Sequence, residues 1–241
     1  MKYIKKSKQE PKGLVNWRTQ EEKADRINYD RRDGKSLWAY FPSKPDVTKE
    51  NAYSKQELWN EHLIVEQGKI CAYCGRRIEA HSEGEPRIEH LNPKSEDKYR
   101  KLTLNYHNLV AVCQGDENPI SPHCDAKKGA IEISVFPTDV SCEEKFIYKW
   151  DGRVKAKDDD RYIKADIETL GLNVAKLKIA RKNVVMKVET FLKELNEQCD
   201  KNSKLKEINK RIKFLQDRHK AEFIEFCFVE VYYLRKELGK T

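Results

Sequence analysis

Four cysteines and the residues between them are the part of the sequence best suited to chemistry. Cys71 and Cys74 form a Cys-x-x-Cys pair, and Cys113 and Cys124 follow further along the chain. Thiolates at this spacing are typical zinc ligands, and four of them close a structural zinc site. We expect these four cysteines to hold one structural Zn²⁺. The second pair is more widely separated than in an ordinary zinc knuckle, and His123 is a competing fourth ligand.

A second set of polar residues lies inside the window that the cysteines enclose. Glu89 and His90 are adjacent, Asn108 precedes Cys113, and Asp125 directly follows Cys124. Two carboxylates leave open positions on a divalent cation, which suits Mg²⁺ or Mn²⁺ better than zinc. We expect Glu89 and Asp125 to bind this catalytic ion, and His90 to act as general base on a water molecule. Asn108 is expected to anchor the loop that bears His90.

Asn105 and His107 lie close enough to Asn108 in the sequence to compete with it for the anchoring role.

Basic residues also lie around this set in the sequence. The predicted nucleic-acid contacts are the basic residues of the loop and of the segment after Asp125, namely Lys94, Lys98, Arg100, Lys101, Lys127 and Lys128.

The local patterns predict the elements that must position these residues. Ser54 and Glu57 form a capping box, which predicts a helix to about Gln67. Residues 87–91 and 109–112 have the composition of short strands. Ser121 and Pro122 indicate the start of a short helix that ends near Gly129. A strand–loop–strand–helix order therefore carries the candidate site.

The flanking regions are different in character. Residues 1–53 are polar and interrupted by Pro and Gly, which predicts an irregular arm with one short helix around residues 18–28. Asp151-Gly152 predicts a β-hairpin over residues 146–155, followed by a linker from Asp158. Asn173 is a candidate helix cap. Apolar periodicity predicts an antiparallel helical pair, with one helix over 174–195 and one long helix from Leu205 to Val229.

These patterns give an α+β chain in four parts. The predicted parts are the arm (1–53), the stapled module with its leading helix (54–133), the hairpin and linker (134–161), and a C-terminal helical region (162–241). The 241 residues are 38% hydrophobic and 37% charged, which favours a modest core with exposed helices. The net charge is +8, and residues 174–187 contain Lys and Arg but no Asp or Glu, which is compatible with a nucleic-acid partner.

Composition also excludes some classes of protein. No apolar run is long enough to cross a membrane, and the basic N-terminus lacks the apolar stretch of a secretory signal. Seven cysteines with a Cys-x-x-Cys pair favour metal binding in a reducing cytoplasm over a disulfide framework.

The ordered motifs CAYC, EHLNP, HNLVAVC and HCDAKKG over residues 71–129 resemble the HNH, or ββα-metal, endonuclease family. The resemblance implies that His90 is the general base, that Glu89 and Asp125 are metal ligands, and that Asn108 is the anchoring amide. Two features depart from the family pattern: the last metal ligand is usually His or Asn, and the second cysteine pair is usually closely spaced. The first leaves the metal preference open, and the second weakens the assignment of Cys124.

A narrower resemblance covers the segments MKYIKKSKQEPKGL, EHLNPK, CDAKKG and WDGRV…TLGLN. They are similar to the HNH subunit of Septu-type anti-phage defence, which also occurs beside retron reverse transcriptases. This implies a bacterial cytoplasmic nuclease that acts on DNA or RNA with an ABC-type ATPase subunit, and with a retron reverse transcriptase and its DNA where one is present. Two other functions remain open: a zinc ribbon that binds nucleic acid without cutting it, and a structural adaptor.

Overall fold

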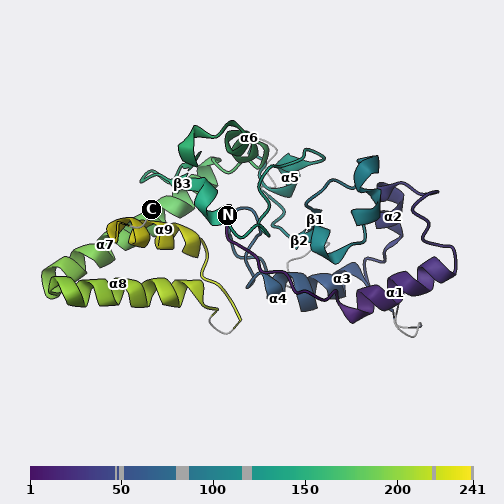
Figure 1. The fold of residues 1–241 in the computed structure, drawn as a ribbon, viewed down its shortest axis with the longest axis horizontal. Coiled ribbons are helices and arrows are strands. Elements are labelled where there is room, and N and C mark those ends of the chain that lie inside the picture. Colours follow the sequence, from purple (N-terminus) through teal and green to yellow (C-terminus); the bar gives the residue numbers. More distant parts are fainter. Residues whose placement is uncertain (47, 49–51, 80–86, 116–120, 219–220, 240–241) are drawn as a thin grey trace.

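The computed structural model describes residues 1–46, 48, 52–79, 87–115, 121–218 and 221–239. The chain is α+β, as predicted: helices surround two small antiparallel sheets. Figure 1 shows an elongated molecule with the N-terminal helices at one end, the C-terminal helical hairpin at the other, and the two sheets between them.

The N-terminal region is more ordered than the predicted arm. It contains α1 (Lys12–Lys23) and α2 (Gly34–Tyr40), so the first helix begins earlier than predicted and the second was not predicted. The segment before α1 lies along the body of the protein, where the backbone N–H of Ile4 donates to Pro137 O at 2.7 Å. Trp17 and Phe41 are buried against each other, with ring centroids 4.6 Å apart. The apolar residues of this region therefore pack on the protein itself.

The leading helix forms as the capping box predicts. Ser54 accepts from the backbone N–H of Glu57, and helical structure runs through α3 (Lys55–Glu57), the π-helix η1 (Leu58–Leu63) and α4 (Ile64–Glu66). Gln67 follows with its amide buried, accepting from Ala111 N at 2.7 Å and donating to Ala111 O at 2.8 Å. These bonds attach the end of the helix to a strand of the candidate module.

Both predicted strands of the module are present. Strand β1 (Ile88–His90) pairs antiparallel with β2 (Leu109–Ala111), with Glu89 opposite Val110. The intervening loop contains the 3₁₀ turns η2 (Asp97–Leu102) and η3 (Tyr106–Asn108). Helix α5 (Asp125–Lys128) ends at Gly129, as predicted.

The predicted start of α5 is wrong. Ser121 and Pro122 precede the helix rather than begin it, and the cap residue is Cys124, which has a positive φ of 53°. The backbone N–H of Cys124 donates to Leu170 O at 2.9 Å. This contact with a later part of the chain outweighs the local Ser-Pro signal, which is a weak preference.

The predicted hairpin consists of β3 (Phe146–Tyr148) and β4 (Val154–Ala156), flanked by the 3₁₀ turns η4 (Cys142–Lys145) and η5 (Lys157–Asp159). The predicted linker after it is wrong, because Asp160 caps a further helix, α6 (Arg161–Thr169). Asn173 does not cap a helix either. Its side chain accepts from Val154 N at 2.8 Å and donates to Val154 O at 2.9 Å, which attaches it to the hairpin.

The C-terminal region contains three helices where two were predicted. Helix α7 (Ala175–Gln198) matches its prediction, but the predicted long helix is divided into α8 (Lys201–Gln216) and α9 (Cys227–Glu237). Helix α9 packs against both α7 and α8. The third helix, α9, therefore lies against both members of the predicted pair, as Figure 1 shows.

The division between α8 and α9 has a visible cause. Helix α8 ends at Gln216, because Asp217 is extended, and Phe226, with a left-handed φ of 54°, is the residue that caps the start of α9. The N–H of Phe223 donates to Gly68 O at 2.9 Å, and that of Phe226 to Gly75 O at 3.1 Å. The segment thus exchanges helical hydrogen bonds for bonds to the loop that holds Cys71 and Cys74. Residues 219 and 220, which the predicted long helix included, lie outside the described residues.

Among the described residues, no helix is long and apolar enough to cross a membrane.

Candidate nuclease site

The four cysteines of the module converge. The sulfurs of Cys71, Cys74, Cys113 and Cys124 all lie within 4.8 Å of one another, in the interior of the protein. Cys71 Sγ is 3.8 Å from Cys124 Sγ, and Cys74 Sγ is 3.7 Å from Cys113 Sγ. The wide spacing of the second pair in the sequence therefore does not prevent it from meeting the first.

The chemistry of this cluster fits a structural Zn²⁺. Burial raises the pKa of the Cys74 and Cys124 thiols well above the usual value. Four thiolates this close together would repel one another without a cation, and zinc bound by four thiolates is a common structural arrangement. His123 lies beside the cluster, with Nδ1 3.2 Å from Cys124 Sγ and 3.8 Å from Cys113 Sγ. The four sulfurs are enough for a four-coordinate zinc site without His123.

The two predicted carboxylate ligands lie next to each other. Glu89 is on β1 and buried, whereas Asp125 is at the start of α5 with its side chain 29% exposed. The Arg87 guanidinium lies 3.9 Å from Asp125 Oδ2. Burial raises the pKa of Glu89 to about 7, the nearby Asp125 carboxylate adds to this rise, and the Lys128 ammonium opposes it. Cys124, one of the four clustered cysteines, immediately precedes Asp125, so the same short segment contributes to both the cysteine cluster and the carboxylate pair.

His90 follows Glu89 on β1 and lies in the interior. Its Nε2 is 3.1 Å from Thr103 O, and Nδ1 has no hydrogen-bond partner within the described residues. A carbonyl oxygen can only accept, so Nε2 carries the proton and Nδ1 is left with a lone pair. This is the tautomer that a general base acting through Nδ1 requires.

The surroundings of His90 also enclose it. The Trp38 ring lies edge-on, with its centroid 4.6 Å from that of the imidazole. Burial, followed by the nearby Lys94 charge, lowers the pKa of His90 to about 3. The imidazole is therefore neutral at pH 7, but it is a weaker base than one whose pKa lies near the working pH.

Asn108, the predicted anchor of the loop, bonds to two residues of that loop through its side chain. Its Oδ1 accepts from Asn92 N at 2.8 Å and from Asn92 Nδ2 at 3.1 Å. Its Nδ2 donates to Asn92 O at 3.1 Å and to Leu102 O at 3.2 Å. Asn105 instead begins η3, where its side chain accepts from His107 N. Of the three polar residues near this position, Asn108 is the one that ties the loop to β1.

The predicted nucleic-acid contacts fall into two groups. Lys98 is paired with Glu132 at 2.6 Å, and Arg100 is paired with Asp97 at 2.7 Å. Within the described part of the chain, Lys94, Lys101 and Lys127 make no ion pair, and the last two are exposed.

Lys128 is placed differently from a surface phosphate contact. Its side chain is fully buried, and its ammonium lies 2.6 Å from Glu89 Oε1. The prediction that Lys128 binds nucleic acid directly is therefore wrong for this arrangement.

Some residues of the site were not found by sequence reasoning. Trp38 lies in the region that was predicted to be an irregular arm, and Thr103 and Gln67 were not singled out. Each acts through a contact with a residue far away in the sequence: Trp38 with His90, and Gln67 with Ala111. The sequence contains no local signal for such contacts. Asn92 had one, because it lies in the EHLNP motif.

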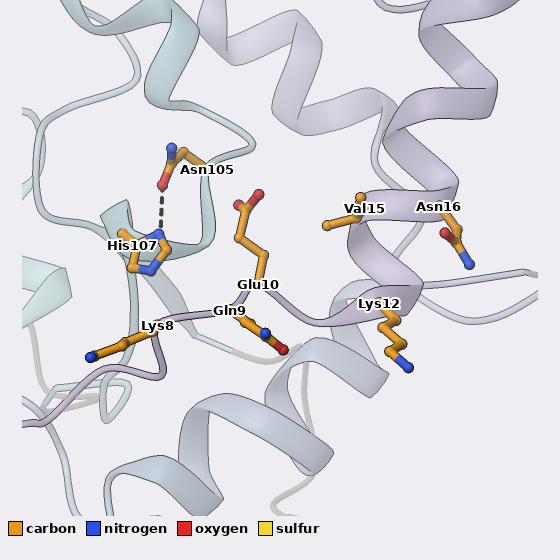
Figure 2. A pocket seen from close by; sticks show the side chains of 8 residues that line it. All are labelled: Lys8, Gln9, Glu10, Lys12, Val15, Asn16, Asn105 and His107. Carbon is orange, nitrogen blue, oxygen red and sulfur yellow. Dashed lines mark hydrogen bonds between the residues drawn. The ribbon is translucent and has the colours of Figure 1, made fainter.

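A hollow lies away from the candidate site, where the N-terminal segment meets the turn of residues 105–107. Figure 2 shows Asn105, His107 and Lys8 on one side of it and Lys12 and Asn16 on the other, with Glu10 between. Its volume is about 490 Å³. His107 Nε2 lies 3.0 Å from Ser7 O, which holds the segment in place.

The comparison with known proteins gives one informative relative. Over 172 residues the chain is 27% identical to the "Retron Vc95 putative HNH endonuclease" of Vibrio cholerae serotype O1 biovar El Tor, covering 69% of this chain and 80% of that protein. No family model matches the chain. The similarity supports the resemblance to HNH endonucleases that the motifs indicate.

Proposed function

We propose that the protein is a metal-dependent endonuclease of the HNH type, which hydrolyses phosphodiester bonds in nucleic acid. The observation that carries this proposal is the proximity of Glu89 on β1 to Asp125 on α5, with His90 next in sequence on β1, in a module that also contains the four clustered cysteines. The relative from a retron supports the same activity.

Glu89 and Asp125 would hold Mg²⁺ or Mn²⁺, since carboxylate oxygens are the ligands these ions prefer. When bound, such an ion would stabilise negative charge on the phosphate and its leaving oxygen. His90 would take the proton of the attacking water at Nδ1, with its ring oriented by the bond from Nε2 to Thr103 O. Asn108 would keep the loop that contains Thr103 in register with β1.

The direct test replaces the proposed base. His90→Ala is expected to reduce cleavage of a plasmid or oligonucleotide in the presence of Mg²⁺ or Mn²⁺ by about 10²-fold or more, because general bases contribute rate factors of this size. His62→Ala is the matched control, since this imidazole lies on η1, outside the site. Zinc content and the melting temperature show whether each variant is folded. Cleavage by a folded His90→Ala variant at the wild-type rate would remove His90 from the mechanism.

A non-cutting zinc module or adaptor is the alternative. It would bind nucleic acid or a partner equally well with and without His90, and it would need no pair of carboxylates. The proximity of Glu89 and Asp125 favours the nuclease.

We further propose that this activity belongs to a bacterial anti-phage defence complex with an ABC-type ATPase, as the resemblance to Septu subunits implies. The name of the relative supports a retron context. The enclosed His90 supports low activity of the isolated chain, with the ATPase partner restraining or directing cleavage. We expect the isolated chain to cut slowly in a gel assay. Rapid, unregulated cleavage would contradict this regulation.

A further inference from the structure

Lys128 connects the two halves of the proposed site from within the protein. Its ammonium lies 2.6 Å from Glu89 Oε1 and donates to His90 O at 3.2 Å. It is on α5, one helical turn after Asp125. One buried side chain thus contacts the proposed metal ligand Glu89 and the backbone of the proposed base.

The surroundings leave this ammonium little freedom. The Lys128 side chain has no exposed area, and the side chain of Glu89 is only 7% exposed. The Lys128 backbone N–H donates to Cys124 O at 2.9 Å, which links the residue to the cysteine cluster. A charge held this deeply cannot reach a phosphate at the surface without leaving its partner, and separating a buried pair is unfavourable.

We propose that Lys128 is a positioning residue, which fixes Glu89 and the β1 backbone at His90 relative to Asp125. The carboxylates of Glu89 and Asp125 repel each other when they lie close together. The Lys128 ammonium, which contacts Glu89 in the protein interior, offsets this repulsion. This leaves the exposed side of Asp125 free to face solvent and substrate. The inference rests on the proposed nuclease function.

The test separates positioning from phosphate binding. Lys128→Met keeps the length of the side chain and removes the charge. Because Lys128 does not face the surface, the variant should lose about 10²-fold in kcat while KM for an oligonucleotide stays unchanged, since misplacement of reacting groups by about 1 Å has effects of this size. Lys128→Arg keeps the positive charge and should recover part of the loss. The exposed Lys145 provides the control variant Lys145→Met.

A second readout does not depend on cleavage. Fluorescence anisotropy with a labelled oligonucleotide and no divalent ion should give the same affinity and salt dependence for wild type and Lys128→Met. Weaker binding with a smaller salt slope would show a phosphate contact and overturn the proposal, as would an unchanged kcat in a folded variant that retains zinc. If Lys128→Met does not fold, Lys128→Gln takes its place. Loss of kcat with wild-type binding supports the proposal, and weaker binding or an unchanged kcat overturns it. Absence of cleavage by wild type, with or without its partner, would instead contradict the proposed function.

Discussion

At the scale of single residues, the contacts of a side chain were easiest to predict where they involve near neighbours in the sequence. Asn108 was separated from Asn105 and His107 by its position before the second strand, and its bonds to Asn92 and Leu102 agree with that choice. Lys128 was misjudged because it alternates with the exposed Lys127 on a single helical turn. Composition cannot show which of two adjacent lysines faces the core.

The Asn108 network gives a prediction about stability. Asn108→Ala removes bonds to both the N–H and the carbonyl of Asn92 and leaves these groups unpaired in a partly buried setting. We expect the free energy of unfolding to fall by about 2–3 kcal/mol, since unsatisfied buried polar groups are costly. Urea denaturation measures this change.

Asn105→Ala is the matched control, because its side chain accepts a single bond, from His107 N, at the start of a short turn. It should lower the free energy of unfolding by no more than about 1 kcal/mol. Equal losses in the two variants would show that Asn108 is not the anchor of the loop.

At the scale of elements, prediction succeeded where a local pattern and tertiary packing agree. The capping box, the two strands of the module and the Asp-Gly hairpin are formed as expected. Prediction failed where contacts with residues far away in the sequence determine where an element begins or ends. The long C-terminal helix is broken because Phe223 and Phe226 bond to the cysteine loop at Gly68 and Gly75, and no feature of residues 205–229 shows that partner.

The same contacts predict that the stability of α9 depends on the proposed zinc site. Cys113→Ser should lower the zinc content to near zero, because it removes one of four converging sulfurs. Hydrogen exchange should then increase in residues 87–113 and also at the start of α9, whose preceding segment is held by the cysteine loop. Atomic spectroscopy and exchange mass spectrometry measure both effects.

Cys199→Ser is the control for this experiment. Cys199 lies between α7 and α8, outside the cluster, and its variant should retain one zinc per chain. If Cys113→Ser also retained full zinc, the site with four thiolate ligands would be wrong, and His123 would have to be considered as a ligand.

At the scale of the whole molecule, the elongated shape separates the candidate site from much of the positive charge. The loop that carries the cations of residues 94–101 packs near α2, whereas α7 and α8 extend to the opposite end of the molecule, as Figure 1 shows. The net charge of +8 therefore does not identify a single binding surface. The distribution of charge along the sequence could not reveal this separation, because it depends on how the helices are arranged.

This arrangement predicts which cations bind nucleic acid. Lys94 and Lys101 belong to the loop beside His90 and make no ion pair within the described residues. Lys94→Gln with Lys101→Gln should weaken oligonucleotide binding and reduce the slope of log K against log salt by about 1.4–1.8, because each phosphate contact contributes about 0.7–0.9. Lys201→Gln with Lys206→Gln, at exposed positions of α8, removes the same charge from the other end of the molecule. Anisotropy titrations at several salt concentrations compare the two variants, and equal changes in slope would show that net charge, rather than the loop beside the site, attracts the nucleic acid.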